Sequence, residues 1–167
     1  SLANKATMKL AYYTKKGTSW SRSEMDFEDK NEHVSLNAIA DDASKIVYTY
    51  STASKLPQYF VADLKKNKVS NEKIFTALNK KLEKKYMPKS EIITWTGYNG
   101  DEVTGILYYP NNYQEGKKYP LMLNIHGGPS SQDTDEWSGS WAYYPSILVQ
   151  KNMFVLMPNY HGSSNHG

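Results

Sequence analysis

Two polar loops that contain histidine, glycine and serine each follow an apolar run in the second half of the chain. The first run, residues 121–125, leads into the loop 126–129, and the second, residues 153–157, leads into the loop 159–164. Apolar runs that end in glycine-bearing loops are typical of an open α/β sheet, in which chemistry takes place at the carboxyl ends of the strands. We therefore predict that strand 121–125 is buried in the middle of a sheet, beside strand 153–157, with the 126–129 loop at its carboxyl end.

The loop His126-Gly127-Gly128-Pro129 is the strongest candidate for chemistry. In α/β-hydrolases the loop after the third strand supplies a backbone N–H to the oxyanion hole. Such a donor stabilises the negative charge of a tetrahedral intermediate, and glycine lets the backbone come close to it. The alternative is a plain tight turn after a buried strand.

A serine nucleophile is not recognisable in the sequence, because no Gly-x-Ser-x-Gly motif occurs. Gly17-Thr-Ser-Trp-Ser21 lacks the final glycine, and residues 162–167 have the wrong spacing. Ser130, Ser131, Ser163 and Ser164 are interpreted as hydrogen-bonding loop residues. In α/β-hydrolases the order along the chain is nucleophile, acid, histidine, so a histidine as early as His126 is a poor candidate for the catalytic histidine. We expect its neutral ring to pack and form hydrogen bonds within the loop.

The polar and aromatic residues allow three other interpretations. His161 and His166 with Asp133 or Asp135 could bind a metal, but their spacing is not that of a helical His-x-x-x-His pair, so no metal or other cofactor is predicted. The acidic loop Asp133, Asp135 and Glu136 could meet a substrate amine, although solvated charge is the simpler interpretation. Trp137, Trp141, Tyr143 and Tyr144 could line a pocket, although packing of a following helix is more common.

Composition narrows the class of protein. The 167 residues suffice for about one domain, and an aromatic content of 13% argues against disorder. The net charge of +3 is small and scattered, which argues against nucleic-acid binding. No cysteine is present, so disulfides, thiolate nucleophiles and cysteine-bound zinc are excluded. No run has the length of a membrane span and no signal peptide is visible, and the compartment stays open.

The first part of the chain reads as an all-β region. Strands are expected at 8–13, 23–27, 33–40, 45–50 and 58–64, with a turn at 41–44. Short strands separated by turns at this spacing favour a sandwich, barrel or propeller.

A different pattern begins near residue 71. Ile74, Leu78 and Leu82 recur at helical spacing among lysines, which predicts an amphipathic helix over 71–87 that ends before Pro88. After it, residues 92–95 and 103–109 flank an Asn-Gly turn and predict a β-hairpin. A helix is expected within 141–150. We place a domain boundary near Met87.

The second half resembles the prolyl oligopeptidase family of serine peptidases, particularly its acylaminoacyl-peptidase and dipeptidyl-peptidase branch. The resemblance rests on Gly100–Pro110, Lys118–Pro129 and Val155–Ser163, which follow one another with the order and spacing of that family's hydrolase domain. A weaker match, Ala40–Tyr48, is similar to a strand–turn–strand of a propeller blade.

The resemblance implies a fragment of a serine peptidase that hydrolyses short peptides through an acyl-enzyme. Residues 1–87 would be the end of a β-propeller with a linker helix, and residues 88–167 the start of an α/β-hydrolase domain. Gly128 would give the oxyanion N–H, with His126, Gly127 and Pro129 shaping the loop. The triad would lie outside this chain, which alone would be inactive. The partners would be the rest of the protein and, in a homo-oligomer, a second copy.

One departure from the family pattern concerns the second loop. The family has arginine where this chain has His161, and a Gly-x-Gly turn where it has residues 164–167. An esterase of the same fold, or a hydrolase-like interaction protein whose site has decayed, therefore remain alternatives.

Overall fold

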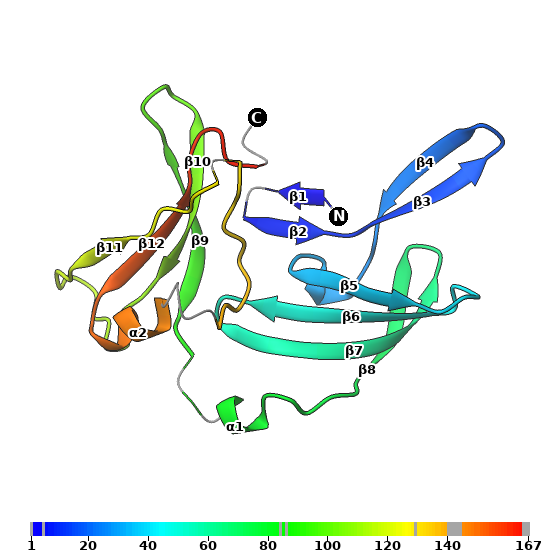
Figure 1. The fold of residues 1–167 in the computed structure, drawn as a ribbon, viewed down its shortest axis with the longest axis horizontal. Coiled ribbons are helices and arrows are strands. Elements are labelled where there is room, and N and C mark those ends of the chain that lie inside the picture. Colours follow the sequence, from blue (N-terminus) through cyan, green and yellow to red (C-terminus); the bar gives the residue numbers. More distant parts are fainter. Residues whose placement is uncertain are drawn as a thin grey trace.

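The computed structural model describes residues 2–4, 6–83, 85, 87–128, 130–139 and 145–164. In that part of the chain, two four-stranded sheets stand side by side, with two smaller strand pairs at the amino-terminal end (Figure 1). The predicted change in character from an all-β first part to a mixed second part is present.

The first large sheet is an antiparallel meander. Its strands are β5 (Val34–Ile39), β6 (Lys45–Thr52), β7 (Lys55–Lys65) and β8 (Lys68–Ile74), in that spatial order. The turn predicted at 41–44 is confirmed, because the Ala43 N–H donates to the Ala40 carbonyl at 2.8 Å between β5 and β6. The strands expected at 33–40, 45–50 and 58–64 are therefore all confirmed.

Tyr48 lies at the centre of the first core. Its side chain is fully buried, and its ring packs edge-on to Phe27 and stacks on Phe60. Its hydroxyl donates a hydrogen bond to the Glu72 carboxylate, which also accepts one from Lys30 at 2.6 Å. Burial is the main cause that raises the pKa of the Tyr48 hydroxyl, so this group stays a donor. The carboxylate is thus paired at the edge of an apolar core.

The amphipathic helix predicted over 71–87 is wrong. Residues up to Ile74 belong to β8, and only α1 (Lys80–Glu83) is helical. Two tertiary contacts hold β8 extended: Val69 is buried against the core, and Glu72 reaches Tyr48. The apolar residues that suggested a helix face, Ile74, Leu78 and Leu82, are 57, 73 and 37% exposed, so no packing surface stabilises a helix there.

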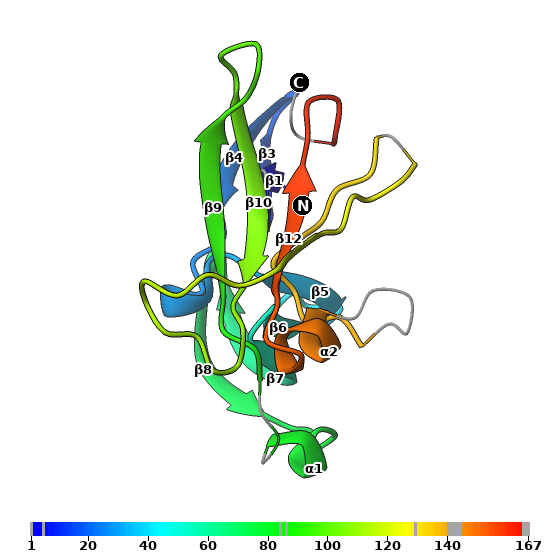
Figure 2. The same cartoon turned by 90° about the vertical axis from the view of Figure 1, so that its left-hand side faces the viewer.

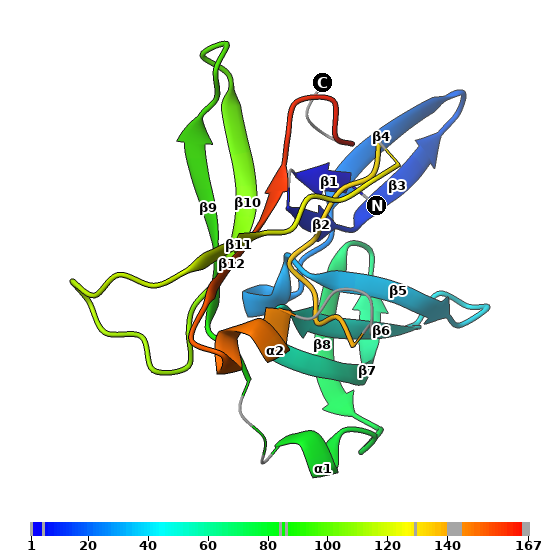
Figure 3. The same ribbon diagram turned by 60° about the vertical axis from the view of Figure 1, so that its left-hand side comes forward.

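The amino-terminal strands form two hairpins. β1 (Leu2–Asn4) pairs with β2 (Thr7–Lys9), and β3 (Ala11–Lys16) pairs with β4 (Ser19–Glu24); a short 3₁₀ turn, Glu28–Lys30, follows. The β3–β4 hairpin projects away from the rest of the molecule (Figure 3). It leaves Trp20 62% exposed. The strand expected at 23–27 is displaced toward the amino terminus, to β4.

The second large sheet contains β9 (Ser90–Thr96), β10 (Glu102–Tyr108), β11 (Leu121–Leu123) and β12 (Phe154–Asn159). Its spatial order is β11-β12-β10-β9, in which β11 and β12 are parallel and the other pairs are antiparallel. The hairpin predicted around the Asn-Gly turn is confirmed. Gly100 in this turn has φ +82°, a conformation that glycine adopts without strain.

The prediction for strand 121–125 is half wrong. The strand is parallel to β12 as expected, but it is short and lies at an edge of the sheet. Leu121, Met122 and Leu123 are 56, 41 and 49% exposed, because within the described residues nothing packs on their outer side. Val155 and Met157 of β12, flanked by strands on both sides, are buried as predicted.

The core of the second sheet includes residues from both halves of the chain. Ile106, Tyr108 and Val155 pack with Val149 of α2 (Pro145–Gln150) and with two alanines, Ala6 and Ala53, from the first half. The helix expected within 141–150 is present as α2; residues 141–144 lie outside the described part. Because the two alanines enter this cluster, the two sheets share a packed seam.

We predict that Tyr48→Phe destabilises the chain by about 1–2 kcal/mol, because it removes a hydrogen bond to a charged carboxylate and leaves Glu72 without that donor. Tyr50→Phe is the matched control, since the Tyr50 hydroxyl only accepts a long, exposed contact of 3.4 Å from Lys55. Urea unfolding of both variants checks this. Equal stability of Tyr48→Phe and the wild type would contradict the role given to this hydroxyl.

Candidate active-site loop

The loop after β11 lies beside the loop after β12, at the carboxyl ends of two parallel strands. The Asn124 N–H donates to the Leu156 carbonyl at 2.9 Å and extends the strand pairing into the first loop. Both loops rise from the same end of the sheet (Figure 2). The prediction that the loop after strand 121–125 lies at its carboxyl end, beside strand 153–157, is therefore confirmed.

His126 anchors the first loop. Its side chain is buried, and its Nε2 lies 3.0 Å from the Ser163 hydroxyl. Its ring stacks on Tyr160 with centroids 4.6 Å apart, and the Tyr160 hydroxyl donates to the His126 carbonyl at 3.0 Å. The expectation that this ring packs and forms hydrogen bonds within the loop region is confirmed.

Asn159 and Asp133 form a second tie between the two loops. The Asp133 N–H donates to the Asn159 side-chain oxygen at 2.7 Å, and the Asn159 amide donates back to the Asp133 carbonyl at 2.8 Å. Asn159 is fully buried, so both halves of its amide are satisfied away from water. The Ser164 N–H adds a bond of 3.0 Å to the Ser131 carbonyl. The loop is thus fixed at both ends.

Gly128 is exposed and has a left-handed backbone conformation. Its φ is +81°, and an added Cβ would meet only the Ser131 Cβ, at 3.8 Å. Glycine is therefore favoured at this position by the positive backbone φ and not by a lack of room for a side chain. No hydrogen bond joins the Gly128 N–H to another described residue, and the residue is exposed. Gly127, beside it, is also exposed, whereas Pro129 lies outside the described residues.

The contact between Ser163 and His126 is not a nucleophile–base pair, although its distance fits one. Ser163 is only 3% exposed, which leaves no room for a substrate carbonyl. The other ring nitrogen, Nδ1, faces the Gly127 carbonyl at 3.3 Å. A ring that donates there accepts the Ser163 hydroxyl proton at Nε2. Ser163 is therefore a structural clamp on the loop.

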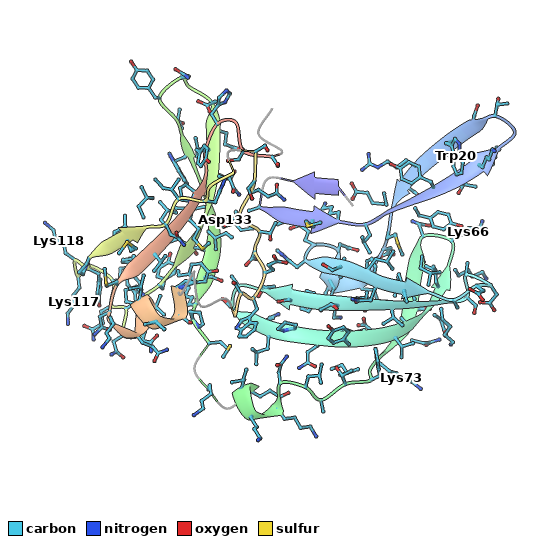
Figure 4. The ribbon with its side chains drawn as sticks, in the orientation of Figure 1. Trp20, Lys66, Lys73, Lys117, Lys118 and Asp133 are labelled. Carbon is cyan, nitrogen blue, oxygen red and sulfur yellow. The ribbon has the colours of Figure 1, made fainter. Side chains whose placement is uncertain are left out.

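The backbone of Asp133 is hydrogen-bonded to Asn159, but one oxygen of its carboxylate lacks a described hydrogen-bond partner. Its Oδ2 is shielded from solvent and has no hydrogen-bond partner among the described residues. Burial raises the pKa of this carboxyl, and the nearby His126 opposes the shift. A cavity of about 120 Å³ adjoins it, lined also by Tyr108, Glu136 and Met157. Figure 4 shows Asp133 between the two sheets, whereas the labelled lysines lie at the periphery.

His161, which replaces the family's arginine, lies at the surface. Its Nδ1 is 3.6 Å from the Asp101 carboxylate in the turn between β9 and β10, and its side chain is 70% exposed. It is not brought together with Asp133 or Asp135, and His166 lies outside the described part. Across the described ranges, no group of three histidine and acidic side chains is placed to hold a metal ion.

The remaining residues singled out in the sequence have mixed outcomes. Trp137 is half-buried, and its backbone N–H donates to the Ser51 hydroxyl of β6 at 2.9 Å. Trp141, Tyr143 and Tyr144 lie outside the described residues. Sequence reasoning missed the roles of Tyr160 and Asn159. The only signal available for them was their place directly after an apolar strand. No described helix has the length and apolar character needed to cross a bilayer.

Comparison with known proteins agrees with this geometry. The chain is 37% identical over 79 residues to the probable dipeptidyl-peptidase 5 of Aspergillus flavus, covering 46% of this chain and 11% of that protein. It is 36% identical over 69 residues to dipeptidyl-peptidase 5 of Porphyromonas endodontalis, covering 41% of this chain and 10% of that protein. The chain thus spans about a tenth of the length of these relatives. No protein-family model matches it.

Solved structures share the fold. An acylaminoacyl peptidase in complex with Z-Gly-Gly-Phe-chloromethyl ketone matches 92% of this chain and 22% of its own, with a TM-score of 0.65 and 18% identity. The Pyrococcus horikoshii acylaminoacyl peptidase matches 78% of this chain and 19% of its own, with a TM-score of 0.58 and 18% identity. A match over 92% of the chain includes both large sheets.

The fold and the loop pair define the class as a segment of a hydrolase-like α/β protein joined to an antiparallel β region. The dipeptidyl-peptidase relatives and the acylaminoacyl-peptidase structures confirm the resemblance to the prolyl oligopeptidase family of serine peptidases.

The Asp133 carboxylate generates a prediction about pH. Its pKa is raised in the folded state, so the folded chain binds this proton more tightly than the unfolded chain. Its contribution to stability is therefore lost as pH rises from the ordinary aspartate pKa through the raised one. Asp133→Asn, which keeps both backbone bonds to Asn159, should raise the melting temperature at pH 7 relative to wild type. The gain should shrink toward pH 3. A gain that grows as pH falls would contradict this.

A second prediction concerns Ser163. Incubation of this chain with a serine-reactive phosphonate and with p-nitrophenyl esters should give no covalent labelling and no hydrolysis, because Ser163 is buried against His126. Mass spectrometry of the treated chain checks this. Stoichiometric labelling that disappears in Ser163→Ala would show that the pair is a nucleophile after all.

Proposed function

We propose that the chain is part of a serine peptidase that hydrolyses short peptides through an acyl-enzyme. Residues 1–87 would hold the last blade of a β-propeller and a linker, and residues 88–167 the first strands of an α/β-hydrolase domain. The observation that carries the proposal is the exposed Gly128 N–H, held at the carboxyl end of β11 with φ +81°.

The chemistry assigned to this loop is stabilisation of an oxyanion. A serine outside the chain would attack the peptide carbonyl, whose oxygen then carries a negative charge. A fixed N–H aimed at that oxygen stabilises the transition state by about 3 kcal/mol without rearranging solvent. Tyr160, Ser163 and Asn159 hold the loop rigid, which is what such a donor requires.

The shape of the two sheets supports the proposed division. β5–β8 form a four-stranded antiparallel sheet, the unit from which propeller blades are built. β11 and β12 are parallel, with their loops at a common end, as in open α/β sheets. The exposed leucines of β11 give a reason for the rest of the protein to be a partner. A further element packed on that edge would bury Leu121 and Leu123 and pair the strand.

The alternatives are less well supported. The named relatives are peptidases, which favours a peptide over a simple ester as substrate. Decay of the site would be expected to loosen the loop, yet every contact of His126 described above is in place. His161 also keeps a carboxylate neighbour, Asp101. A second copy of the protein as a partner remains a prediction.

The proposal is tested by replacing Gly128 in the full-length protein. Gly128→Val should lower kcat roughly a hundredfold with little change in melting temperature, because a β-branched residue resists positive φ and moves the N–H away from the oxyanion. Gly116→Val is the matched control: Gly116 has φ +80° and open space, but lies before β11. His126→Ala should reduce turnover less than Gly128→Val.

Steady-state kinetics on a dipeptidyl or acylaminoacyl substrate, with thermal melts, decide the outcome. Near-normal turnover of Gly128→Val would refute the donor assignment. Complete loss of turnover in His126→Ala without unfolding would show instead that the ring itself acts in the reaction.

A further inference from the structure

The segment 133–137 connects the candidate active-site loop to the first sheet. It leaves the loop, runs down between the two sheets and reaches the turn between β6 and β7 (Figures 1 and 3). It has no regular secondary structure, so its position depends on side-chain and backbone contacts to its neighbours. These contacts lie on both sides of the seam.

Asp135 makes most of the contacts on the side of the first sheet. Its carboxylate accepts the Ala53 N–H at 2.8 Å, and its own N–H donates to the Ala6 carbonyl at 2.8 Å. Its side chain is only 15% exposed. Two residues later, the Trp137 N–H donates to Ser51. The segment is therefore held by β6, by the turn that follows β6 and by the turn between β1 and β2.

His33 completes this set of contacts from the residue before β5. Its Nδ1 lies 3.0 Å from the Asp135 carbonyl and 3.6 Å from the Asp135 carboxylate. Both neighbours are acceptors, so Nδ1 carries the proton. The His33 backbone has φ +69°, which is uncommon for a residue with a side chain. Backbone bonds to Met8 and Ser51 hold it there, and the imidazole is aimed at the segment as a result.

The other end of the segment is joined to the candidate loop. Asp133, two residues before Asp135, is paired with Asn159 through two hydrogen bonds. Asn159 is followed by Tyr160, which stacks on His126 and binds its carbonyl. A continuous series of packed and hydrogen-bonded residues thus runs from His33 to the loop that contains Gly128.

We propose that His33 is a positioning residue for the Gly128 loop, although it belongs to the other sheet. This inference rests on the proposed function, since Gly128 matters only if it serves as an oxyanion donor. By fixing Asp135 in the middle of the segment, His33 also fixes the position of Asp133, two residues earlier, against Asn159. The first sheet then does more than accompany the hydrolase part, because it sets the geometry of the catalytic loop.

A cavity lies beside His33. The space is about 120 Å³ and is lined by Val34, Ser51, Asp135 and Trp137, among others. The same space gives the segment room to shift once its bond to His33 is lost.

The test uses two substitutions of His33 in the full-length protein. His33→Ala removes the donor, whereas His33→Asn keeps a donor near the Nδ1 position and tolerates positive φ. Amide hydrogen exchange of residues 126–131 should speed up by about two- to thirtyfold in His33→Ala, and kcat should fall by a similar factor with KM nearly unchanged. His33→Asn should restore both.

Ser54→Ala is the matched control, because the Ser54 and Ser90 hydroxyls form a hydrogen bond across the same seam without involving the segment. It should leave exchange of the loop and kcat unchanged. Equal effects of Ser54→Ala and His33→Ala, no effect of His33→Ala, or failure of His33→Asn to restore loop protection would each overturn the proposal. If the wild type proves inactive while His33→Ala still exposes the loop, the coupling stands and the proposed function fails.

Discussion

The structure around the candidate site depends on the paired hydrogen bonds between the Asn159 side chain and the Asp133 backbone. The described residues between His126 and Trp137 (126–128 and 130–137) belong to no strand or helix, so they take their position from neighbouring elements. A buried amide supplies them with a donor and an acceptor in one rigid group, at 2.7 and 2.8 Å. Leaving such an amide unpaired would cost about 1–3 kcal/mol for each group, which selects the observed position over shifted ones. The contacts of Tyr160 and Ser163 with His126 then fix the rest of the loop.

The seam between the two sheets follows from the same segment. Ala6 and Ala53 enter the core of the second sheet, where small side chains allow close approach, while Asp135 makes polar contacts at the same place. The seam therefore combines apolar packing with satisfied hydrogen bonds. β11, in contrast, exposes its leucines, and among the described residues only one of its two edges is paired, with β12. Solvent-exposed edges of this kind invite pairing with another strand. The second sheet is thus packed against the first part of the chain, whereas the outer edge of β11 is exposed within the described residues.

Predictions from the sequence are correct where neighbouring residues alone determine the backbone conformation. The Asn99-Gly100 turn and the turn at 41–44 place their hairpins correctly, because turn residues fix the backbone directly. The predictions are wrong where a contact with a residue far away in the sequence determines the local structure. Residues 71–74 have a helical pattern but lie in a strand, since Glu72 binds Tyr48 from 24 positions away. Residues 121–123 have the continuous apolar sequence of a buried strand but are exposed. An apolar sequence does not reveal which other strands or helices pack beside it. The clamps on the loop join residues at least 26 positions apart, which no local pattern encodes.

In the proposed function, the Gly128 N–H stabilises the oxyanion of an acyl-transfer reaction. The most direct measurement is a crystal structure of the full-length protein with a peptidyl phosphonate or chloromethyl ketone bound covalently to its nucleophile. The ligand oxygen in the place of the oxyanion should lie about 2.7–3.1 Å from the Gly128 nitrogen. Gly128 should keep its positive φ, and His126 should keep its contacts with Tyr160 and Ser163. An oxyanion directed away from residues 126–131, with Gly128 in contact with solvent, would contradict the account.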